Sequence, residues 1–178
     1  LYMYALITGA SSGCGYEYAC LLAAKGYDLL IVSNEEAIHD KASSLRNTYP
    51  VNVQSLVMDL GKQDAAKALY DYCQEHEMSV EVLINNAGVY HDRDFLSDSE
   101  AFNQMILNLH MVTPAMLIYY FAQDMAKRGK GYVLNMCSIT ANIAVQRLST
   151  YGATKAFLQN FSRSVYIELK DKGVIITN

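Results

Sequence analysis

A tyrosine and a lysine stand four residues apart in the stretch Tyr151-Gly152-Ala153-Thr154-Lys155. On a helix, this spacing places both side chains on one face. A free phenol titrates near about 10, and a cation held beside it favours the phenolate and lowers its pKa toward neutrality. Lys155 would then make Tyr151 a proton donor at neutral pH. The same spacing is common on solvated helices, so the pair alone leaves both interpretations open.

A second stretch that suits chemistry is rich in glycine and runs from Thr8 to Gly15 as Thr-Gly-Ala-Ser-Ser-Gly-Cys-Gly. It follows a short apolar run and precedes a helical pattern. Backbone amides in such a turn point at a bound phosphate, and the helix N-terminus adds partial positive charge. The spacing is Gly-x-x-x-Gly-x-Gly, not the commonest Gly-x-Gly-x-x-Gly fingerprint. A nucleotide site is predicted here, with cofactor contacts at Gly9, Ser11, Ser12, Gly13, Cys14 and Gly15.

Polar residues also follow the second, third and fourth apolar runs, where ligands of open parallel sheets bind. Asp59 could accept a hydrogen bond from adenine, or cap a helix that begins near Lys62. The run Asn85-Asn86-Ala87-Gly88 could brace the sheet or line the cofactor, and we expect it to do both. Further cofactor contacts are predicted at Ser33, Asn34, Asp59, Leu60, Asn86, Ala87, Gly88, Tyr151 and Lys155.

The residues after the second apolar run bear on the choice of nucleotide. An acid about twenty residues beyond the glycine turn would bind a ribose 2′-hydroxyl, whereas an arginine would suit a 2′-phosphate. The chain has Ser33 and Asn34 there, followed by Glu35 and Glu36. Donors at Ser33 and Asn34 favour a phosphate, and the two glutamates oppose it. The cofactor is therefore NADP or NAD, with a lean toward NADP.

Apolar runs and helical patterns alternate along the chain, as expected for parallel strands buried on both faces and the helices between them. Strands are predicted over residues 2–8, 28–32, 53–58, 80–84, 132–136 and 174–177. Helices are predicted over residues 16–25, 35–48, 64–75, 100–127 and 149–170. Asn34 is a candidate N-cap, and Pro114 should kink its helix or interrupt a backbone bond near His110. The fold class is α/β, a doubly wound parallel sheet in a single domain over residues 1–178.

Composition excludes several function classes. The 178 residues carry a net charge of −4 and no basic cluster, which argues against nucleic-acid partners. The apolar runs fall short of the roughly 20 residues of a membrane helix, so no membrane association is expected. Scattered cysteines and isolated histidines predict reduced thiols, a cytoplasmic location and no metal site. The chain starts at Leu1 and stops at Asn178, so we expect both ends to be cut.

Ser138 follows the fifth predicted strand, thirteen residues before Tyr151. A hydroxyl at that edge could hydrogen-bond a substrate oxygen, although a serine after a strand is usually a turn residue. The ordered set of Thr8–Gly15, Asn85–Gly88, Asn108, Ser138 and Tyr151-x-x-x-Lys155 resembles the short-chain dehydrogenase/reductase family. The resemblance covers nearly the whole chain and is specific as a set.

The resemblance implies a Rossmann sheet that binds NAD(P) and an enzyme that interconverts carbonyls and alcohols. Tyr151 matches the proton donor, Ser138 the residue that holds the substrate oxygen, and Lys155 the residue that binds the nicotinamide ribose. Asn108 would hold a water in a proton relay behind the lysine. Family members continue past the sixth strand into a Pro-Gly turn, a substrate-covering segment and a seventh strand. We expect this C-terminal part to be missing here, which would leave an exposed sheet edge.

The sequence indicates the substrate and the oligomeric state less directly than it indicates the site. Apolar residues before the tyrosine predict a ketone or aldehyde with hydrophobic bulk, such as a 3-oxoacyl compound, although a buried loop would look the same; they are Ile139, Ala141, Ile143, Ala144 and Val145. The family's habit implies a homodimer or homotetramer through the long helices. A non-catalytic nucleotide sensor or scaffold is the alternative. A methyltransferase also uses a glycine turn but has no need of the tyrosine and lysine.

Overall fold

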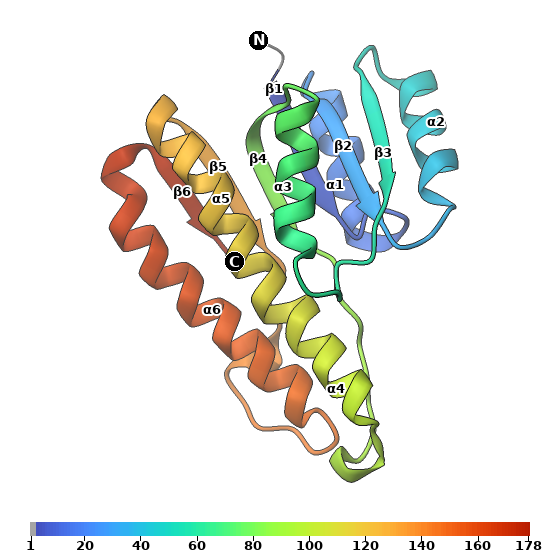
Figure 1. Ribbon diagram of the computed structural model, residues 1–178, viewed down its shortest axis with the longest axis vertical. Coiled ribbons are helices and arrows are strands. Elements are labelled where there is room, and N and C mark those ends of the chain that lie inside the picture. The colour runs from blue at the N-terminus through green and yellow to red at the C-terminus, as the bar shows by residue number, and fades with distance from the viewer. Residues whose placement is uncertain (1–2) are drawn as a thin grey trace.

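A computed structural model describes residues 3–178 and shows one six-stranded parallel sheet (Figure 1). The strands are β1 (Met3–Thr8), β2 (Asp28–Ser33), β3 (Val53–Val57), β4 (Ser79–Asn85), β5 (Gly131–Asn135) and β6 (Val174–Thr177). Their order is β3-β2-β1-β4-β5-β6, so the predicted doubly wound fold is confirmed. Tyr2, predicted to open the first strand, lies outside the described residues.

The direction of winding changes at β1, which pairs with β2 on one side and β4 on the other. Beyond the carboxyl ends of these strands the chain leaves in opposite directions, which opens a crevice at that edge. Thr8 and Asn85 end the two strands that flank the change. The glycine turn and the residues after Asn85 are therefore neighbours although distant in the sequence.

Helices cover both faces of the sheet (Figure 1). Successive strand residues point to opposite faces, so Leu6 joins one apolar core and Ile7 the other. The first core also contains side chains of α3 (Ala65–Glu75), α5 (Thr113–Arg128) and α6 (Ser149–Leu169). The second contains side chains of α1 (Gly13–Ala24) and α2 (Ile38–Thr48). The burial of both strand faces explains why the strand sequences are almost continuously apolar.

The predicted interruption near Pro114 is confirmed as a single π-helical turn. Helix α4 (Glu100–Leu107) runs into a π turn at Asn108–Val112, which leads directly into α5. Proline has no N–H to complete the ordinary ladder, and the N–H of Thr113 instead bonds the carbonyl of Asn108. The continuous helix from Glu100 to Arg128 is long and apolar enough to span a membrane by length and composition, although no apolar run of that length was predicted from the sequence. Phe121 and Met125 on it are buried in the core, as in the core helix of a folded domain.

Helix boundaries correct two details. Helix α2 begins at Ile38 with Ala37 as its N-cap, so the predicted start at Glu35 and the predicted cap at Asn34 are wrong. The N–H of Glu35 bonds the hydroxyl of Ser33 instead, which holds this segment in a turn. Helix α1 begins at Gly13, three residues earlier than predicted. Short 3-10 turns at Phe95–Ser97 (η1), Ile139–Ala141 (η3) and Lys170–Lys172 (η4) complete the chain.

Candidate active site

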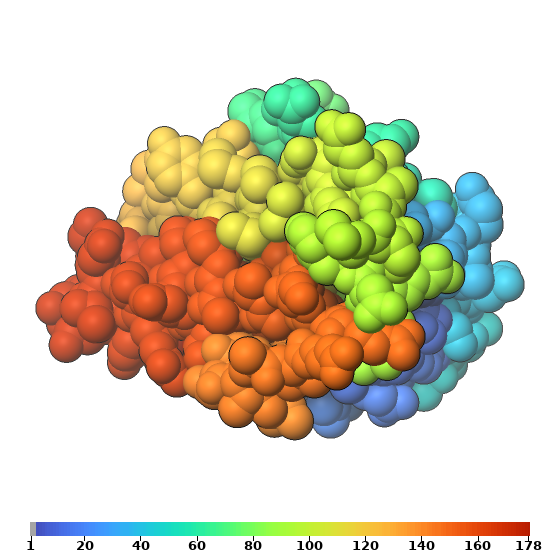
Figure 2. Space-filling model, turned by 90° about the horizontal axis from the view of Figure 1, so that it is seen from below, coloured from blue at the N-terminus to red at the C-terminus, as the bar shows by residue number. Residues whose placement is uncertain are grey.

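A crevice of about 670 Å³ lies at the carboxyl edge of the sheet. It runs from the residues after β2, past the glycine turn, to the start of α6. Its lining includes Gly9, Ser11, Ser12, Cys14, Ser33, Asn34, Glu35, Asp59, Leu60, Asn86, Ala87, Gly88, Val89, Tyr90, Met136, Cys137, Tyr151 and Lys155. Figure 2 looks onto this end of the molecule, where the lime segment around residues 90–105 lies against the orange segment around residues 139–150.

The glycine turn is locked to the segment after β4. Gly9 has φ +66°, and an added Cβ would lie 2.7 Å from the Cα of Ala87. The Asn86 amide donates to the carbonyls of Thr8 and Gly9, at 3.1 and 2.9 Å. The Thr8 hydroxyl accepts from the N–H groups of Asn86 and Ala87, both at 3.0 Å. Asn86 therefore braces the turn and also lines the crevice, as the sequence predicted.

The start of α1 faces the crevice through its N-terminal residues. Its N-cap, Ser12, makes no capping hydrogen bond with its side chain, so the first N–H groups of the helix have no side-chain acceptor there. Ser12 and Cys14 line the crevice, whereas Gly13 and Gly15 are not among its lining residues. Gly15 packs inward, because its Cβ would lie 2.2 Å from the carbonyl oxygen of Gly9.

The opposite end of the crevice is built from hydroxyls, amides and carboxylates. The Ser33 hydroxyl donates to that of Ser11 at 3.1 Å. Asn34 and Glu35 line the wall beside them. Asp59 lines the crevice and accepts from the N–H of Gly61 at 2.9 Å, so its carboxylate shapes the loop after β3. It does not cap α3, whose N-cap is Asp64.

Tyr151 and Lys155 lie together on the first turns of α6, as predicted. The Lys155 Nζ sits 5.7 Å from the centroid of the Tyr151 ring and donates to the carbonyl of Met136 at 2.8 Å. The lysine is buried, and this burial lowers the pKa of its ammonium. The half-buried Tyr151 ring meets the rings of Tyr90 and His110 edge-on, at 5.4 and 5.7 Å between centroids.

Ser138 lies three residues beyond β5 and is the N-cap of η3. Its Oγ accepts from the N–H and the hydroxyl of Thr140, at 3.2 and 2.9 Å. The hydroxyl position is thereby fixed while its own proton stays available for donation. Its contact with a substrate oxygen stays a prediction.

Asn108 lies in the π turn, and its side chain makes two hydrogen bonds within the protein. Its amide donates to the carbonyl of Gly61 at 3.1 Å, and its Oδ1 accepts from Gln104 at 3.2 Å. These bonds tie α4 to the loop after β3. The predicted role of Asn108 in holding a water stays a prediction.

His110 belongs to this site, although it was not among the site residues predicted from the sequence. Its ring is 1% exposed and contacts the Tyr151 ring. Burial and the nearby Lys155 charge lower the pKa of His110 to about 3, so its imidazole is neutral. A lone histidine in a helical pattern carries no signal of such a place. Its closeness to Pro114 was the only hint, because helix irregularities often occur at functional sites.

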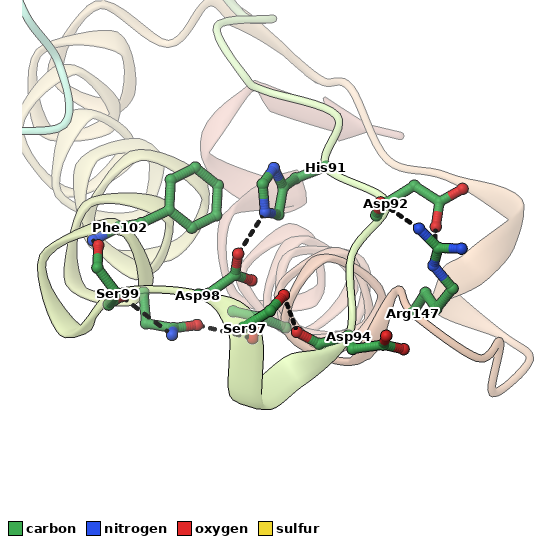
Figure 3. Close-up of polar contacts among 10 residues, drawn as sticks. His91, Asp92, Asp94, Ser97, Asp98, Ser99, Phe102 and Arg147 are labelled. Carbon is green, nitrogen blue, oxygen red and sulfur yellow. Dashed lines mark hydrogen bonds and ion pairs between the residues drawn. The ribbon is translucent and has the colours of Figure 1, made fainter.

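The outer wall beside Tyr151 is held by polar contacts between two loops (Figure 3). His91 pairs with Asp98 at 2.5 Å, and the Phe102 ring packs on the imidazole, 4.0 Å between centroids. Arg147 pairs with Asp92 at 2.9 Å. The Arg147–Asp92 pair joins the segment after β4 to the loop that leads into α6, whereas the His91 contacts hold that segment against the start of α4.

The loop between β5 and α6 presents apolar side chains to solvent. Ile139, Ile143 and Val145 are exposed, so the alternative of a buried loop is wrong. Tyr90, Phe95 and Leu96 are exposed on the loop after β4. Of these residues, Tyr90 lines the crevice beside Tyr151.

The cysteines are free thiols. Cys14 is exposed and lines the crevice, and Cys137 lines it near Lys155. Burial raises the pKa of the Cys137 thiol. Among residues 3–178, no three His, Cys, Asp or Glu side chains gather closely enough to hold a metal ion.

Comparisons with known proteins agree with this architecture. The family model for short chain dehydrogenase matches residues 3–178. Very-long-chain 3-oxoacyl-CoA reductase-A of Danio rerio is 32% identical over 97% of this chain and 55% of its own length. The human protein named inactive hydroxysteroid dehydrogenase-like protein 1 is 28% identical over 97% of this chain and 53% of its own.

Among solved structures, a short-chain dehydrogenase from Sphingobium yanoikuyae in complex with NADPH superposes with a TM-score of 0.91. It is 30% identical, and the match covers 99% of this chain and 68% of that one. The chain spans about half the length of the curated relatives it matches. The match of the family model over nearly the whole chain, together with this shared fold, shows that the chain belongs to the short-chain dehydrogenase family.

Proposed function

We propose that the intact protein is an NAD(P)-dependent oxidoreductase that interconverts a carbonyl and an alcohol, with Tyr151 as general acid and base. The observation that carries this proposal is the shared crevice: Tyr151 and Lys155 line the same cavity as the glycine turn. A site for a nucleotide and a site for proton transfer thus adjoin.

The crevice suits a dinucleotide in shape and in chemistry. Its volume of about 670 Å³ falls in the ordinary range for cofactor sites. Gly9 brings the backbone close to the segment after β4, and the start of α1 offers N–H groups that lack a side-chain cap. Such a helix end favours a pyrophosphate. When bound there, a nicotinamide would supply or accept the hydride.

The protein groups then position and protonate the substrate. The Tyr151 phenol donates its proton to the carbonyl oxygen, and in the reverse direction it accepts the proton of the alcohol. Ser138, held by Thr140, donates a hydrogen bond to the same oxygen, where negative charge develops. Lys155, fixed by the Met136 carbonyl, keeps a cation beside the phenol and has further N–H donors for a ribose hydroxyl.

We propose NADPH as the preferred nucleotide. Ser11, Ser33 and Asn34 offer donors for a 2′-phosphate, while the neighbouring Glu35 carboxylate repels it. Among the described residues that line this end, none is lysine or arginine. The preference is therefore expected to be modest, and limited by Glu35.

Glu35→Gln is expected to tighten NADPH binding about threefold to tenfold and to leave NADH affinity nearly unchanged. One charge pair near the surface contributes on this scale. The measurement is the Kd of each nucleotide by fluorescence titration at low salt. Glu36→Gln is the matched control, because Glu36 carries the same charge but pairs with His39 and does not line the crevice. Equal effects on both nucleotides would contradict the placement of Glu35 beside the 2′-position.

Bound NADPH is expected to slow alkylation of Cys14 by iodoacetamide at least about tenfold, because the thiol is exposed at the turn where the pyrophosphate would lie. Peptide mapping with and without saturating nucleotide measures this. Cys20, partly exposed but not lining the crevice, is the internal control and should be modified at an unchanged rate. Unchanged modification of Cys14 at saturating NADPH would place the nucleotide elsewhere.

We propose a hydrophobic ketone or aldehyde, such as a 3-oxoacyl thioester, as substrate. The exposed side chains of Ile139, Ile143 and Leu96 support this, because an apolar rim beside the proton donor would hold an acyl chain. The name of the Danio rerio relative is in line with it. The decisive measurement is oxidation of NADPH by the intact protein against a panel of carbonyl compounds graded by chain length.

We also propose assembly into a homodimer or homotetramer through the long helices. Val112 and Tyr119 on the π turn and α5, and Ile167 on α6, are large apolar side chains exposed to solvent. Covering them would remove apolar surface from water. Light scattering of the intact protein measures the mass directly, and a monomer at micromolar concentration would overturn this proposal.

A nucleotide-binding scaffold without turnover is the second candidate. The relative whose printed name begins with the word inactive favours it, at 28% identity. Nucleotide binding without carbonyl reduction across the whole panel would select this candidate. The juxtaposition of Tyr151 and Lys155 in one crevice favours the enzyme.

A further inference from the structure

The buried imidazole of His110 joins two parts of the site, the crevice wall at Val89 and the helix that carries Tyr151, by hydrogen bonds. The N–H of Val89 donates to Nε2 at 3.0 Å, and Nδ1 lies 3.1 Å from the Thr154 hydroxyl. That hydroxyl donates in turn to the backbone carbonyl of Tyr151 at 2.7 Å. One end of the chain of bonds is thus the crevice wall, and the other is the residue assigned to proton transfer.

The directions of these bonds follow from the donors. A backbone N–H can only donate, so Nε2 is the acceptor and carries no proton. In a neutral imidazole, Nδ1 then carries the proton and donates to Thr154. The Thr154 hydroxyl accepts this bond and donates to Tyr151. The three bonds therefore run in one direction and leave neither ring nitrogen unpaired.

Local packing reserves this place for the imidazole. A Cβ added at Gly88 would lie 3.0 Å from Nε2, so the backbone passes close to this edge of the ring. His110 and Thr154 are both buried, at 1% and 0% exposure. The π turn brings His110 inward, while Asn108, two residues earlier in the same turn, reaches Gly61. His110 is therefore the side chain of this turn that reaches the Tyr151 helix.

We propose that His110 is a positioning residue, which couples the crevice wall at Val89 to the main chain of Tyr151 and so sets the phenol against the bound nucleotide. Only the expected effect of His110 on turnover rests on the proposed function; the hydrogen-bonded coupling itself does not. The two ring nitrogens have separate tasks: Nε2 holds the wall beside the cofactor, and Nδ1 orients Tyr151 through Thr154.

Two substitutions separate the tasks in the intact protein. His110→Gln places an amide oxygen near the Nε2 position and loses the bond to Thr154. It is expected to lower kcat about tenfold or more, because small misplacements of reacting groups are costly, with the Kd of NADPH within about threefold. His110→Asn places an amide N–H near the Nδ1 position and leaves the Val89 N–H unpaired. It is expected to raise that Kd about tenfold, with a smaller loss of kcat.

Thr154→Val tests the link itself. It should lower kcat as His110→Gln does, and the double variant should lose no more than either single variant. Two outcomes would overturn the proposal and show that His110 only fills space. One is a loss of kcat in the double variant equal to the product of the two single losses. The other is the same change of kcat and of Kd in His110→Gln as in His110→Asn.

Hydrogen exchange at the Val89 amide gives a readout independent of turnover. The amide should be protected in the wild type and in His110→Gln, and should exchange faster in His110→Asn. Equal protection in both variants overturns the coupling even if the enzyme is active. Absence of any carbonyl turnover in the wild type, with this exchange pattern intact, would overturn the proposed function and leave the coupling standing.

Discussion

Tyr151→Phe is expected to lower kcat for carbonyl reduction by about 10²- to 10⁴-fold, the range typical for loss of a general acid. The substitution removes only the hydroxyl. The ring keeps its edge-on contacts with Tyr90 and His110, and the main chain keeps its bond from Thr154. Stability and NADPH affinity should therefore stay close to those of the wild type.

Three measurements on the intact protein decide this prediction: steady-state reduction of the best carbonyl substrate, fluorescence titration with NADPH, and thermal unfolding. Tyr119→Phe is the matched control, because this exposed phenol on α5 lies outside the crevice and its removal should leave kcat unchanged. Turnover of Tyr151→Phe within tenfold of the wild type would remove Tyr151 from proton transfer. Loss of NADPH binding would assign Tyr151 to the cofactor site instead.

The fold was predictable because strands that are buried on both faces have almost continuously apolar sequences. Leu29, Leu30, Ile31 and Val32 on β2 are all completely buried, and only a strand covered on both faces shows such a run. The alternation of strand and helix predicted a parallel sheet with helices on both faces, and the structure supplied the order of its strands. The start of α2 was not predictable in this way, since Ser33 captures the N–H of Glu35 and delays the helix to Ile38.

The crevice was largely predictable because Ser33, Asp59 and Asn86 end or follow strands of one sheet, and because the resemblance to the family placed Tyr151 beside them. Ser33, Asp59, Asn86 and Tyr151 do line one cavity. Individual side-chain directions were less accessible. Whether Asn108 or His110 reaches the Tyr151 helix depends on the π turn. A π turn closes its hydrogen bond over five residues instead of four, so its side chains point in directions that ordinary helical spacing does not predict.

The inward packing of Gly15 was likewise not predictable from the sequence. The sequence motif suggested a glycine that admits a phosphate, but the nearest atoms to its missing Cβ belong to Gly9 and Asn86. Asn86 lies far away in the sequence, and no local pattern predicts that contact. The glycine turn is thus a joint between β1, α1 and the end of β4 as well as a binding loop.

Gly15→Ala is therefore expected to destabilise the protein by about 2–3 kcal/mol, the range for overpacking a rigid site. The added Cβ would lie 2.2 Å from the Gly9 carbonyl oxygen and 2.5 Å from the Asn86 amide nitrogen, and the backbone on both sides is fixed. Helix propensity acts in the opposite direction, because alanine stabilises a helix interior by up to about 1 kcal/mol over glycine. The sign of the change in the free energy of unfolding therefore shows whether overpacking or helix propensity dominates.

The midpoint and slope of urea unfolding measure this change, and NADPH titration measures the accompanying loss of affinity at the displaced turn. Gly13→Ala is the matched control: no atom lies within 4 Å of its added Cβ, so only the strain of its φ of +53° remains. That strain costs about 1–2 kcal/mol, less than the expected effect at Gly15. A Gly15→Ala protein as stable as the wild type would mean that the turn can move away from Asn86, and the brace between the first and fourth strands would then not define the cofactor crevice.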